Sequence, residues 1–178
     1  MSKIIIPREH KEIKQQAEVE AYLNERSIFC DRWSLYPKVE MLLDGELLAL
    51  YKSFIDPIME KRGYSTADII RLNSQSENLP AQRAKFAAEH CHNEDEVRFF
   101  VRGRGYFWFH FEDECEPVIC VICEAGDLLG VPAGIRHWFE VDDLPDLIAI
   151  RFFTDPAGWV PEYTDSNIHR LYTRPKKL

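Results

Sequence analysis

The sequence predicts a mainly β fold, an antiparallel β-sandwich or barrel with several helices preceding it. In the second half of the chain, short runs rich in β-branched and aromatic residues alternate with turn residues, a spacing typical of antiparallel sheets. In the first half, longer runs carry apolar residues at helical spacing. A length of 178 residues is enough for one domain with a substantial core and short for two.

We therefore expect one domain over residues 1–178. Its helix-rich N-terminal part covers 1–89, its β-barrel core covers about 90–153, and a C-terminal segment covers 154–178. The change from helical to alternating periodicity near residue 90 places the first of these boundaries.

Helical periodicity in the N-terminal part predicts a series of helices between short extended runs. Helices are expected at residues 13–24, 39–61 and 80–89, with a shorter one from residue 65, and extended runs at 3–6 and 28–35. The best helical pattern contains Pro57, which predicts a kink or an early end. Gly63 is the expected stop, and the hydroxyl residues Ser65 and Thr66 supply a cap for the next helix.

Six β-rich runs make up the predicted barrel core. They lie at residues 97–101, 106–111, 117–122, 127–131, 137–141 and 147–153. A polar stretch at 112–116 is expected to be a solvated hairpin tip and not a metal cluster. Gly103 and Gly105 break the preceding β-rich run and predict a hairpin turn. They do not indicate a dinucleotide-binding fold, because the third glycine and the following helix of that motif are missing.

Composition excludes several classes of partner. The net charge of −8, from 30 acidic and 22 basic residues, argues against a nucleic-acid surface, which needs clustered Lys and Arg. No run of 18 apolar residues is present, and the N-terminus lacks the apolar stretch of a signal peptide. We therefore expect a cytoplasmic monomer with neither a membrane nor a nucleic-acid partner.

The five cysteines cannot all form pairs. Cys120 and Cys123 lie in an apolar run, where residues three apart face opposite sides of a strand. A zinc knuckle or a redox CxxC pair is therefore not expected. We expect reduced thiols that act as small apolar residues.

The stretch that carries the chemistry is HCHNEDE at residues 90–96. His90 and His92 are two residues apart, so on an extended strand they face the same side and can share one ligand. Glu96 has the same parity, and a short bend lets its carboxylate reach the point where the imidazoles converge. His137, just past a Pro-x-Gly turn, is the candidate fourth donor. The alternative is that the paired histidines lie on the surface and that the single histidine is a hydrogen-bonded core residue.

Three imidazoles and one carboxylate favour Fe(II), Ni(II), Co(II) or Mn(II), one ion per chain. Cu(I) and a closed structural zinc site fit less well, because no thiolate takes part. An octahedral ion with four protein donors would keep two positions for water, and a bidentate oxygen ligand could displace both.

The two segments that carry these donors resemble a known superfamily. Two motifs resemble the paired motifs of the cupins: His90-x-His92-(x)3-Glu96-(x)6-Gly103 and Gly126-(x)5-Pro132-x-Gly134-(x)2-His137. Ala84 stands where a glycine often precedes the first motif, and Val141 stands where an asparagine often ends the second. Neither position is a metal ligand in cupins, so the departures concern loop geometry. The resemblance implies a cupin-type barrel with the four donors as metal ligands.

A closer resemblance covers nearly the whole chain. Residues 94–100, 131–139 and 150–160, with 29–33 and the helix that ends near Gly63, are similar to the acireductone dioxygenase family of the methionine salvage pathway. This implies that O2 adds to 1,2-dihydroxy-3-oxo-5-(methylthio)pentene, with Fe(II) or Ni(II) as the cofactor. With Fe(II) the implied products are formate and 4-methylthio-2-oxobutanoate. With Ni(II) they are formate, carbon monoxide and 3-methylthiopropanoate.

Four further residues are candidates for the substrate site. Arg98 shares the parity of the carboxylate donor, so its guanidinium could stabilise negative charge on the substrate, unless it is an exposed strand arginine. Phe139 follows the fourth donor by two residues, and Phe100 shares the parity of Arg98. The resemblance adds Trp159 as another pocket wall. Each aromatic residue could equally belong to the core.

Two other functions remain open. One is a cupin oxygenase that acts on a different enediol or thiol, and the other is a non-catalytic cupin that binds a small ligand or serves as an interaction module. A complete set of four donors argues against the second, because a storage or scaffold cupin does not require it. His10, His110 and His169 belong to no ligand pattern and are expected to be structural or surface residues.

Overall fold

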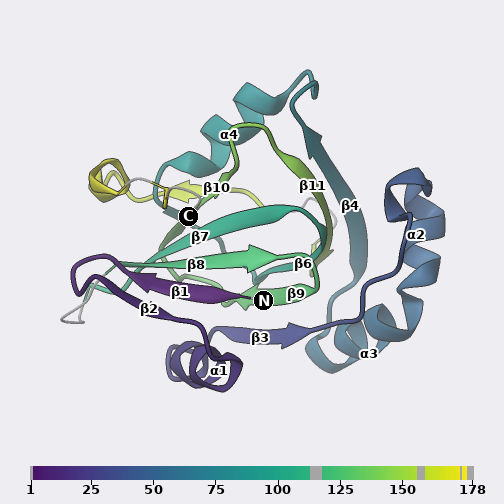
Figure 1. Ribbon diagram of the computed structural model, residues 1–178, viewed down its shortest axis with the longest axis horizontal. Helices are drawn as coiled ribbons and strands as arrows, with labels where there is room; N and C mark the ends of the chain where they lie inside the picture. Colours follow the sequence, from purple (N-terminus) through teal and green to yellow (C-terminus); the bar gives the residue numbers. More distant parts are fainter. Residues whose placement is uncertain (1, 113–117, 156–158, 173, 176–178) are drawn as a thin grey trace.

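The computed structural model describes residues 2–112, 118–155, 159–172 and 174–175, and its strands form two antiparallel sheets (Figure 1). The first sheet has seven strands in the order β12 (Glu162–Tyr163), β5 (His90–Cys91), β10 (His137–Val141), β7 (Arg104–His110), β8 (Val118–Glu124), β1 (Lys3–Ile6) and β2 (Lys11–Ile13). The second has five in the order β3 (Phe29–Arg32), β9 (Asp127–Val131), β6 (Glu96–Arg102), β11 (Asp146–Phe153) and β4 (Thr66–Asn73).

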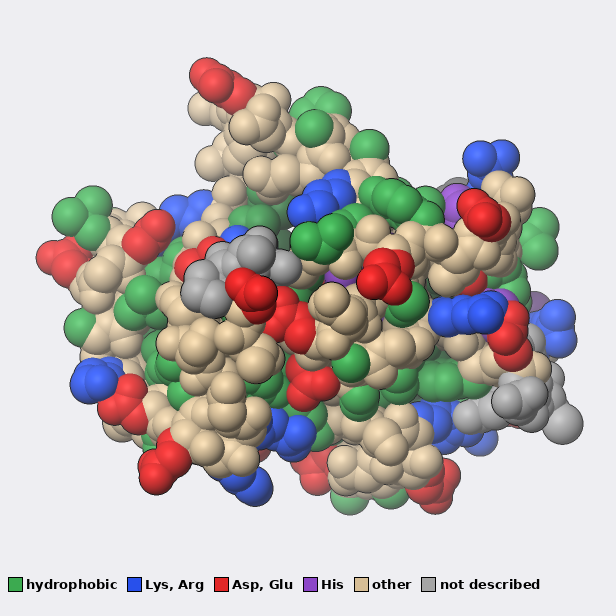
Figure 2. Space-filling view, turned by 180° about the vertical axis from the view of Figure 1, so that it is seen from behind, with side chains coloured by type: hydrophobic (Ala, Val, Ile, Leu, Met, Phe, Trp, Pro, Cys, Tyr) green, Lys and Arg blue, Asp and Glu red, His purple; other side chains and the backbone are tan. Residues whose placement is uncertain are grey.

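The helices lie outside the sheets. They are α1 (Gln16–Asn24), α2 (Asp44–Leu50), α3 (Lys52–Arg62) and α4 (Leu79–Ala87), with 3-10 turns at Val39–Met41 and Ile168–Leu171. In Figure 1, α2 and α3 lie beside β4 at the right, and α4 lies at the top, where it packs against β10. In the described part of the chain, no helix is long and apolar enough to cross a membrane. Acidic and basic side chains are interspersed over the face shown in Figure 2.

The main hydrophobic core fills the space between the two sheets. Phe100 from β6 and Phe107 from β7 are fully buried there. A second cluster, which includes Tyr51 and Phe99, lies between the five-stranded sheet and the helices α2 and α3. The five-stranded sheet is therefore covered on both faces, which explains why every residue of β6 from Glu96 to Val101 is buried.

The predicted fold class is confirmed, since the chain is an antiparallel β-sandwich accompanied by helices. The strand expected at 3–6 and those expected at 127–131 and 137–141 have the predicted bounds. Residues 113–116 of the expected hairpin tip lie outside the described residues.

The helix expected from residue 65 is wrong, because β4 occupies Thr66–Asn73 and pairs along its whole length with β11. Ala67 and Ile69 pack against the cluster beneath α2 and α3, whereas Ile70 and Leu72 contact the core between the sheets. This alternation has the period of two that belongs to a strand. The hydroxyl of Ser65 caps no helix and instead donates to carbonyl groups at the end of β11.

The N-terminal helices also differ in extent from the prediction. The helix expected at 39–61 is divided into a 3-10 turn, α2 and α3, and the break between the two helices falls at the buried Tyr51. Pro57 lies inside α3 without ending it. The helix expected at 13–24 begins at Gln16, because the residues before it pair with β1 as strand β2.

The four cysteines that the structure describes are free thiols. Cys120 packs into a cluster on the outer face of β8, and Cys123 packs into the core between the sheets. Their side chains therefore point in opposite directions, as the strand period predicts. This excludes a shared metal or a disulfide between them.

Candidate metal centre

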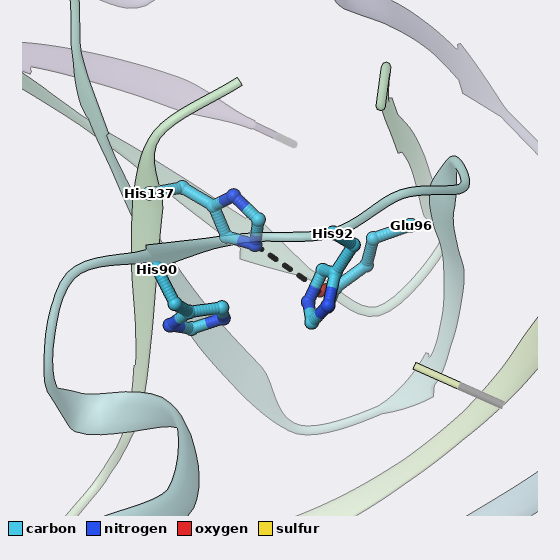
Figure 3. A group of neighbouring side chains, drawn as sticks. All are labelled: His90, His92, Glu96 and His137. Atoms are coloured by element: carbon cyan, nitrogen blue, oxygen red, sulfur yellow. Dashed lines mark hydrogen bonds and ion pairs between the residues drawn. The ribbon is translucent and has the colours of Figure 1, made fainter. Parts of the chain in front are cut away.

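The four predicted donors come from both sheets and meet at one place. His90 begins β5 and pairs with His137, the first residue of β10, while Glu96 begins β6 in the other sheet and His92 lies in the loop between. Their ligand atoms all lie within 4.8 Å of one another. Figure 3 shows the four side chains directed toward a common centre.

Each histidine ring is held in one orientation by a backbone carbonyl. In His90 and His137 the acceptor is the carbonyl two residues earlier, at 2.7 and 2.8 Å from Nδ1. In His92 the acceptor is the carbonyl of Val160, at 2.9 Å from Nδ1. A carbonyl oxygen can only accept a hydrogen bond, so each Nδ1 carries the proton and each Nε2 presents a lone pair to the centre.

The inward-facing atoms form a site for a cation. Oε2 of Glu96 lies 3.0 Å from Nε2 of His92 and 3.2 Å from Nε2 of His137, so a proton or a metal ion must lie between the carboxylate oxygen and these ring nitrogens. Nε2 of His90 is buried and has no hydrogen-bond partner among the described residues. Such a cluster of electron pairs is stable only with a proton or a metal ion between them.

Arg98 on β6 holds the other oxygen of the carboxylate. Its Nη2 donates to Oε1 of Glu96 at 2.8 Å, and both side chains are almost fully buried. Burial opposes ionisation of Glu96, but the charge of Arg98 and the hydrogen bonds from His137 and His92 outweigh it and hold the pKa of Glu96 well below its usual range. Glu96 therefore remains a carboxylate with Oε2 directed at the centre.

The histidines differ in their protonation. Burial lowers the pKa of His90 to about 4, and the neighbouring His137 adds to this effect. Burial also disfavours the charged form of His92, but the hydrogen bond to Glu96, the charge of Glu96 and the hydrogen bond to the Val160 carbonyl together outweigh burial and raise the pKa of His92. His90 is thus a neutral ligand, and a metal ion would take the place of the proton that His92 otherwise holds against the carboxylate.

This donor set fits a divalent metal ion. Three neutral imidazoles and one carboxylate would leave the complex with a net charge of about +1, and nitrogen and oxygen donors suit the first-row divalent metals. All four side chains are buried, so the ion would lie inside the barrel and out of bulk water. The chemistry that the arrangement supports is metal-dependent.

Of the candidate substrate residues, Arg98, Phe139 and Trp159 lie close to one another, whereas Phe100 lies in the core. The guanidinium carbon of Arg98 lies 4.1 Å from the ring centroid of Phe139 and 5.3 Å from that of Trp159. The Trp159 ring is also 6.3 Å from that of His92, so it lies beside the donors. Phe100 is fully buried in the core between the sheets.

Two residues near the donors were not predicted from the sequence. The ring of Phe86 lies 5.7 Å from that of His90, and the ring of Tyr163 lies 6.2 Å from it. Phe86 precedes His90 by four residues on the helix that leads into the motif, and that proximity is a signal that could have found it. Tyr163 comes close only because β12 pairs with β5.

The remaining histidines are structural or exposed. Nδ1 of His110 lies 2.7 Å from Oε2 of Glu89, whose carboxylate is buried next to the first donor. Nδ1 of His169 accepts the backbone N–H of Glu89 at 3.4 Å. His10 is exposed on the surface.

Comparison with known proteins agrees with this geometry. The model of the ARD/ARD' family matches residues 5–161. The acireductone dioxygenase of Picosynechococcus sp. is 42% identical over 157 residues, which cover 88% of this chain and 88% of that protein. The acireductone dioxygenase of Pseudomonas fluorescens is 42% identical over 158 residues, covering 88% of this chain and 86% of that protein.

A solved structure shares the fold over most of both chains. The acireductone dioxygenase from Bacillus anthracis, with a cadmium ion in its active centre, superimposes with a TM-score of 0.85 at 33% identity. The superposition covers 92% of this chain and 98% of that one. The chain therefore belongs to the ARD/ARD' family of acireductone dioxygenases, metal-dependent enzymes built on the cupin fold.

Proposed function

We propose that the chain oxidises 1,2-dihydroxy-3-oxo-5-(methylthio)pentene with O2 in the methionine salvage pathway, with one Fe(II) or Ni(II) ion per chain. With Fe(II) the products would be formate and 4-methylthio-2-oxobutanoate. With Ni(II) they would be formate, carbon monoxide and 3-methylthiopropanoate. Both routes place the two oxygen atoms of O2 in the products, and they differ in whether one further carbon leaves as carbon monoxide.

One observation carries this proposal, the buried centre of three histidines and one glutamate with its donor atoms within 4.8 Å of one another. When bound, the metal would supply a Lewis acid and a template for the oxygen atoms of the enediol. His90, His92, Glu96 and His137 would hold it, and the hydrogen bonds at Nδ1 would keep each ring aimed at it.

Arg98 would have two tasks. It fixes the orientation of Glu96, and its Nε is buried without a hydrogen-bond partner among the described residues. Its positive charge would also stabilise an ionised enediol bound at the centre. Phe139, on which the guanidinium stacks, would keep that charge in place. Phe100 would support Phe139 from within the core between the sheets.

We infer that the substrate enters through a cavity of about 670 Å³ beside β4 and α4. Phe86 and Trp159 line this cavity, and the same two rings lie near the ligand histidines. The volume suits a small molecule, and the aromatic walls suit an apolar methylthio tail. Lys85 also lines the cavity and would offer positive charge to an anionic substrate on its way in, whereas the charge of Arg151 there is offset by Asp68, which lines the same cavity.

We further propose that the enzyme works as a monomer in the cytoplasm. All four donors belong to one chain, so a single copy has a complete metal centre. The described cysteines are free thiols, and that is the usual state in a reducing compartment.

The test is product analysis with defined metals. Apo protein reconstituted with Fe(II) is expected to consume O2 with acireductone and to release formate and the keto acid, and the same batch with Ni(II) should release carbon monoxide as well. Gas and acid analysis of the two reactions decides the outcome. Identical products with the two metals would contradict the claim that the metal determines the products. If neither metal supported acireductone-dependent oxygen uptake, the proposed substrate would be wrong.

A further inference from the structure

Two loops that carry the metal donors are tied directly to each other. The backbone N–H of Gly134 donates to the carbonyl of His92 at 2.9 Å, and the N–H of Ala133 donates to Oδ1 of Asp95 at 3.1 Å. Two consecutive amides of the second loop therefore bind the first loop. The same second loop supplies the carbonyl that orients the ring of His137.

The other atoms of Asp95 bind two further segments. Oδ2 accepts the hydroxyl of Tyr64 at 3.1 Å, at the point where the chain enters β4. The backbone carbonyl of Asp95 accepts the indole N–H of Trp159 at 3.1 Å. Burial and the adjacent carboxylate raise the pKa of Tyr64, so its hydroxyl keeps the proton that it donates. Asp95 is thus contacted from three parts of the chain.

We propose that Asp95 is a positioning residue of the metal centre. It does not itself line the cavity, and its described hydrogen bonds do not reach the donors' ligand atoms, but it joins the loop that ends in Glu96 to the loop that precedes His137. Its carboxylate sets the separation of the two loops, and its backbone carbonyl fixes the wall formed by Trp159. The inference rests on the metal site of the proposed function and not on the identity of the products.

The reason that this linkage matters is geometric. Glu96 and His137 lie on opposite sheets, so their own strands do not pair, and the strand pairing that connects the two loops ends at Glu96 and Val131, before the loop that leads to His137. A metal site keeps its affinity only when its donors are held to about half an ångström. Removal of an outer group that orients metal ligands lowers metal affinity by about 10- to 100-fold.

The experiment compares Asp95→Ala with Asp95→Asn. The apo forms of both variants and of the wild type are titrated with Ni(II) in competition with a chelator, and their melting temperatures are recorded. Asp95→Ala is expected to raise the Kd for Ni(II) by about 10- to 100-fold. Asp95→Asn should recover most of the affinity, because its amide oxygen can still accept from Ala133 and its NH2 group can donate to the Tyr64 oxygen.

The chain offers a matched control elsewhere. Tyr106 donates its hydroxyl to Oδ1 of Asp142 at 2.8 Å, the same type of contact away from the donors. Asp142→Ala should leave the Kd for Ni(II) unchanged even if its melting temperature falls. A wild-type Kd in Asp95→Ala, or an equal rise in Asp142→Ala, would overturn the proposal.

A second pair of variants serves if Asp95→Ala does not fold. Tyr64→Phe removes one of the two side-chain contacts of Asp95 and is expected to weaken Ni(II) binding by a smaller factor than the alanine variant would. Tyr106→Phe should not change the binding, and an equal effect of the two tyrosine variants would count against the proposal. Because Ni(II) binding is measured without acireductone, unexpected products in the activity assay would not affect this result.

Discussion

Nη2 of Arg98 donates to Oε1 of Glu96 at 2.8 Å, and the other carboxylate oxygen then faces two imidazoles. The guanidinium is held in turn by the ring of Phe139 at 4.1 Å. This one ion pair keeps the donor charged in a buried place and decides which of its oxygens points at the metal centre. We therefore expect Arg98 to affect metal binding as well as any substrate that binds there.

Removing this guanidinium tests both effects. Arg98→Ala would leave a buried carboxylate without its counter-charge, so we expect a loss of about 3–5 kcal/mol in the free energy of unfolding. Metal affinity should fall by about 10- to 100-fold. Arg98→Lys keeps the positive charge but lacks the planar guanidinium, so it should recover only part of the lost stability and part of the lost metal affinity. Urea unfolding and metal analysis measure the two effects. Full metal content with a fall in kcat alone would assign Arg98 to the substrate only.

Removing a donor should separate metal binding from folding. His92 lies in the loop between β5 and β6, so His92→Ala is expected to bind far less metal while keeping the fold. Metal content and far-UV circular dichroism check this. His10→Asn is a suitable control, because His10 is exposed and has a φ of 50°, which asparagine tolerates. Full occupancy in His92→Ala would contradict its assignment as a ligand.

Substitution by alanine is expected to have opposite effects on stability at two glycines. A Cβ at Gly105 would lie 2.6 Å from the ring of Phe139 and 2.7 Å from that of Phe100, so Gly105→Ala should cost about 1–3 kcal/mol of stability. Because Phe139 supports Arg98, turnover should also fall. At Gly45, in α2, a Cβ would meet nothing within 4 Å, and Gly45→Ala should stabilise the fold by about 0.5 kcal/mol. Thermal unfolding and steady-state kinetics of both variants give the comparison.

Charge at the cavity should control the rate at which an anionic substrate arrives. Lys85 lines the cavity, and its Nζ lies 3.3 Å from the carbonyl of Trp159. Lys85→Glu is expected to lower kcat/KM, most strongly at low ionic strength, because it replaces a positive charge at the cavity with a negative one. Lys11→Glu, on the edge strand β2, makes the same change in net charge and should have little effect. Equal salt dependence in the two variants would place the entrance elsewhere.

Burial should protect two thiols. Cys120 and Cys123 are fully buried, and burial raises the pKa of both thiols well above the usual range, so iodoacetamide should not modify them in the native protein. Of the four cysteines that the structure describes, Cys91 should react first, because it is half-buried, whereas burial raises the pKa of the equally half-buried Cys30 to about 11. Peptide mass analysis before and after unfolding in guanidinium measures the difference. Rapid native labelling of Cys120 would show that β8 opens readily.

The sequence by itself determined the donor set and much of the sheet. His90, His92 and Glu96 lie close together along the chain, so their spacing was enough to predict a shared site, which the structure forms with a bend at residues 93–94 in place of a continuous strand. The strands at 127–131 and 137–141 were also predictable, because β-branched and aromatic residues between turn residues are a local signal.

Only the tertiary structure decided which segments of the chain each strand face contacts. Residues 66–73 form a strand because β11 supplies a complete ladder of hydrogen bonds, which outweighs a local sequence that predicts a helix cap. Parity places Arg98 beside Glu96 on one face of β6, but only the packing of the two sheets shows that Phe139 of β10 lies against its guanidinium. Asp95 binds Ala133, 38 residues away, and no local pattern encodes that contact. Side-chain direction follows from the covalent geometry of a strand, whereas the choice of partner depends on distant segments that come together only when the chain folds.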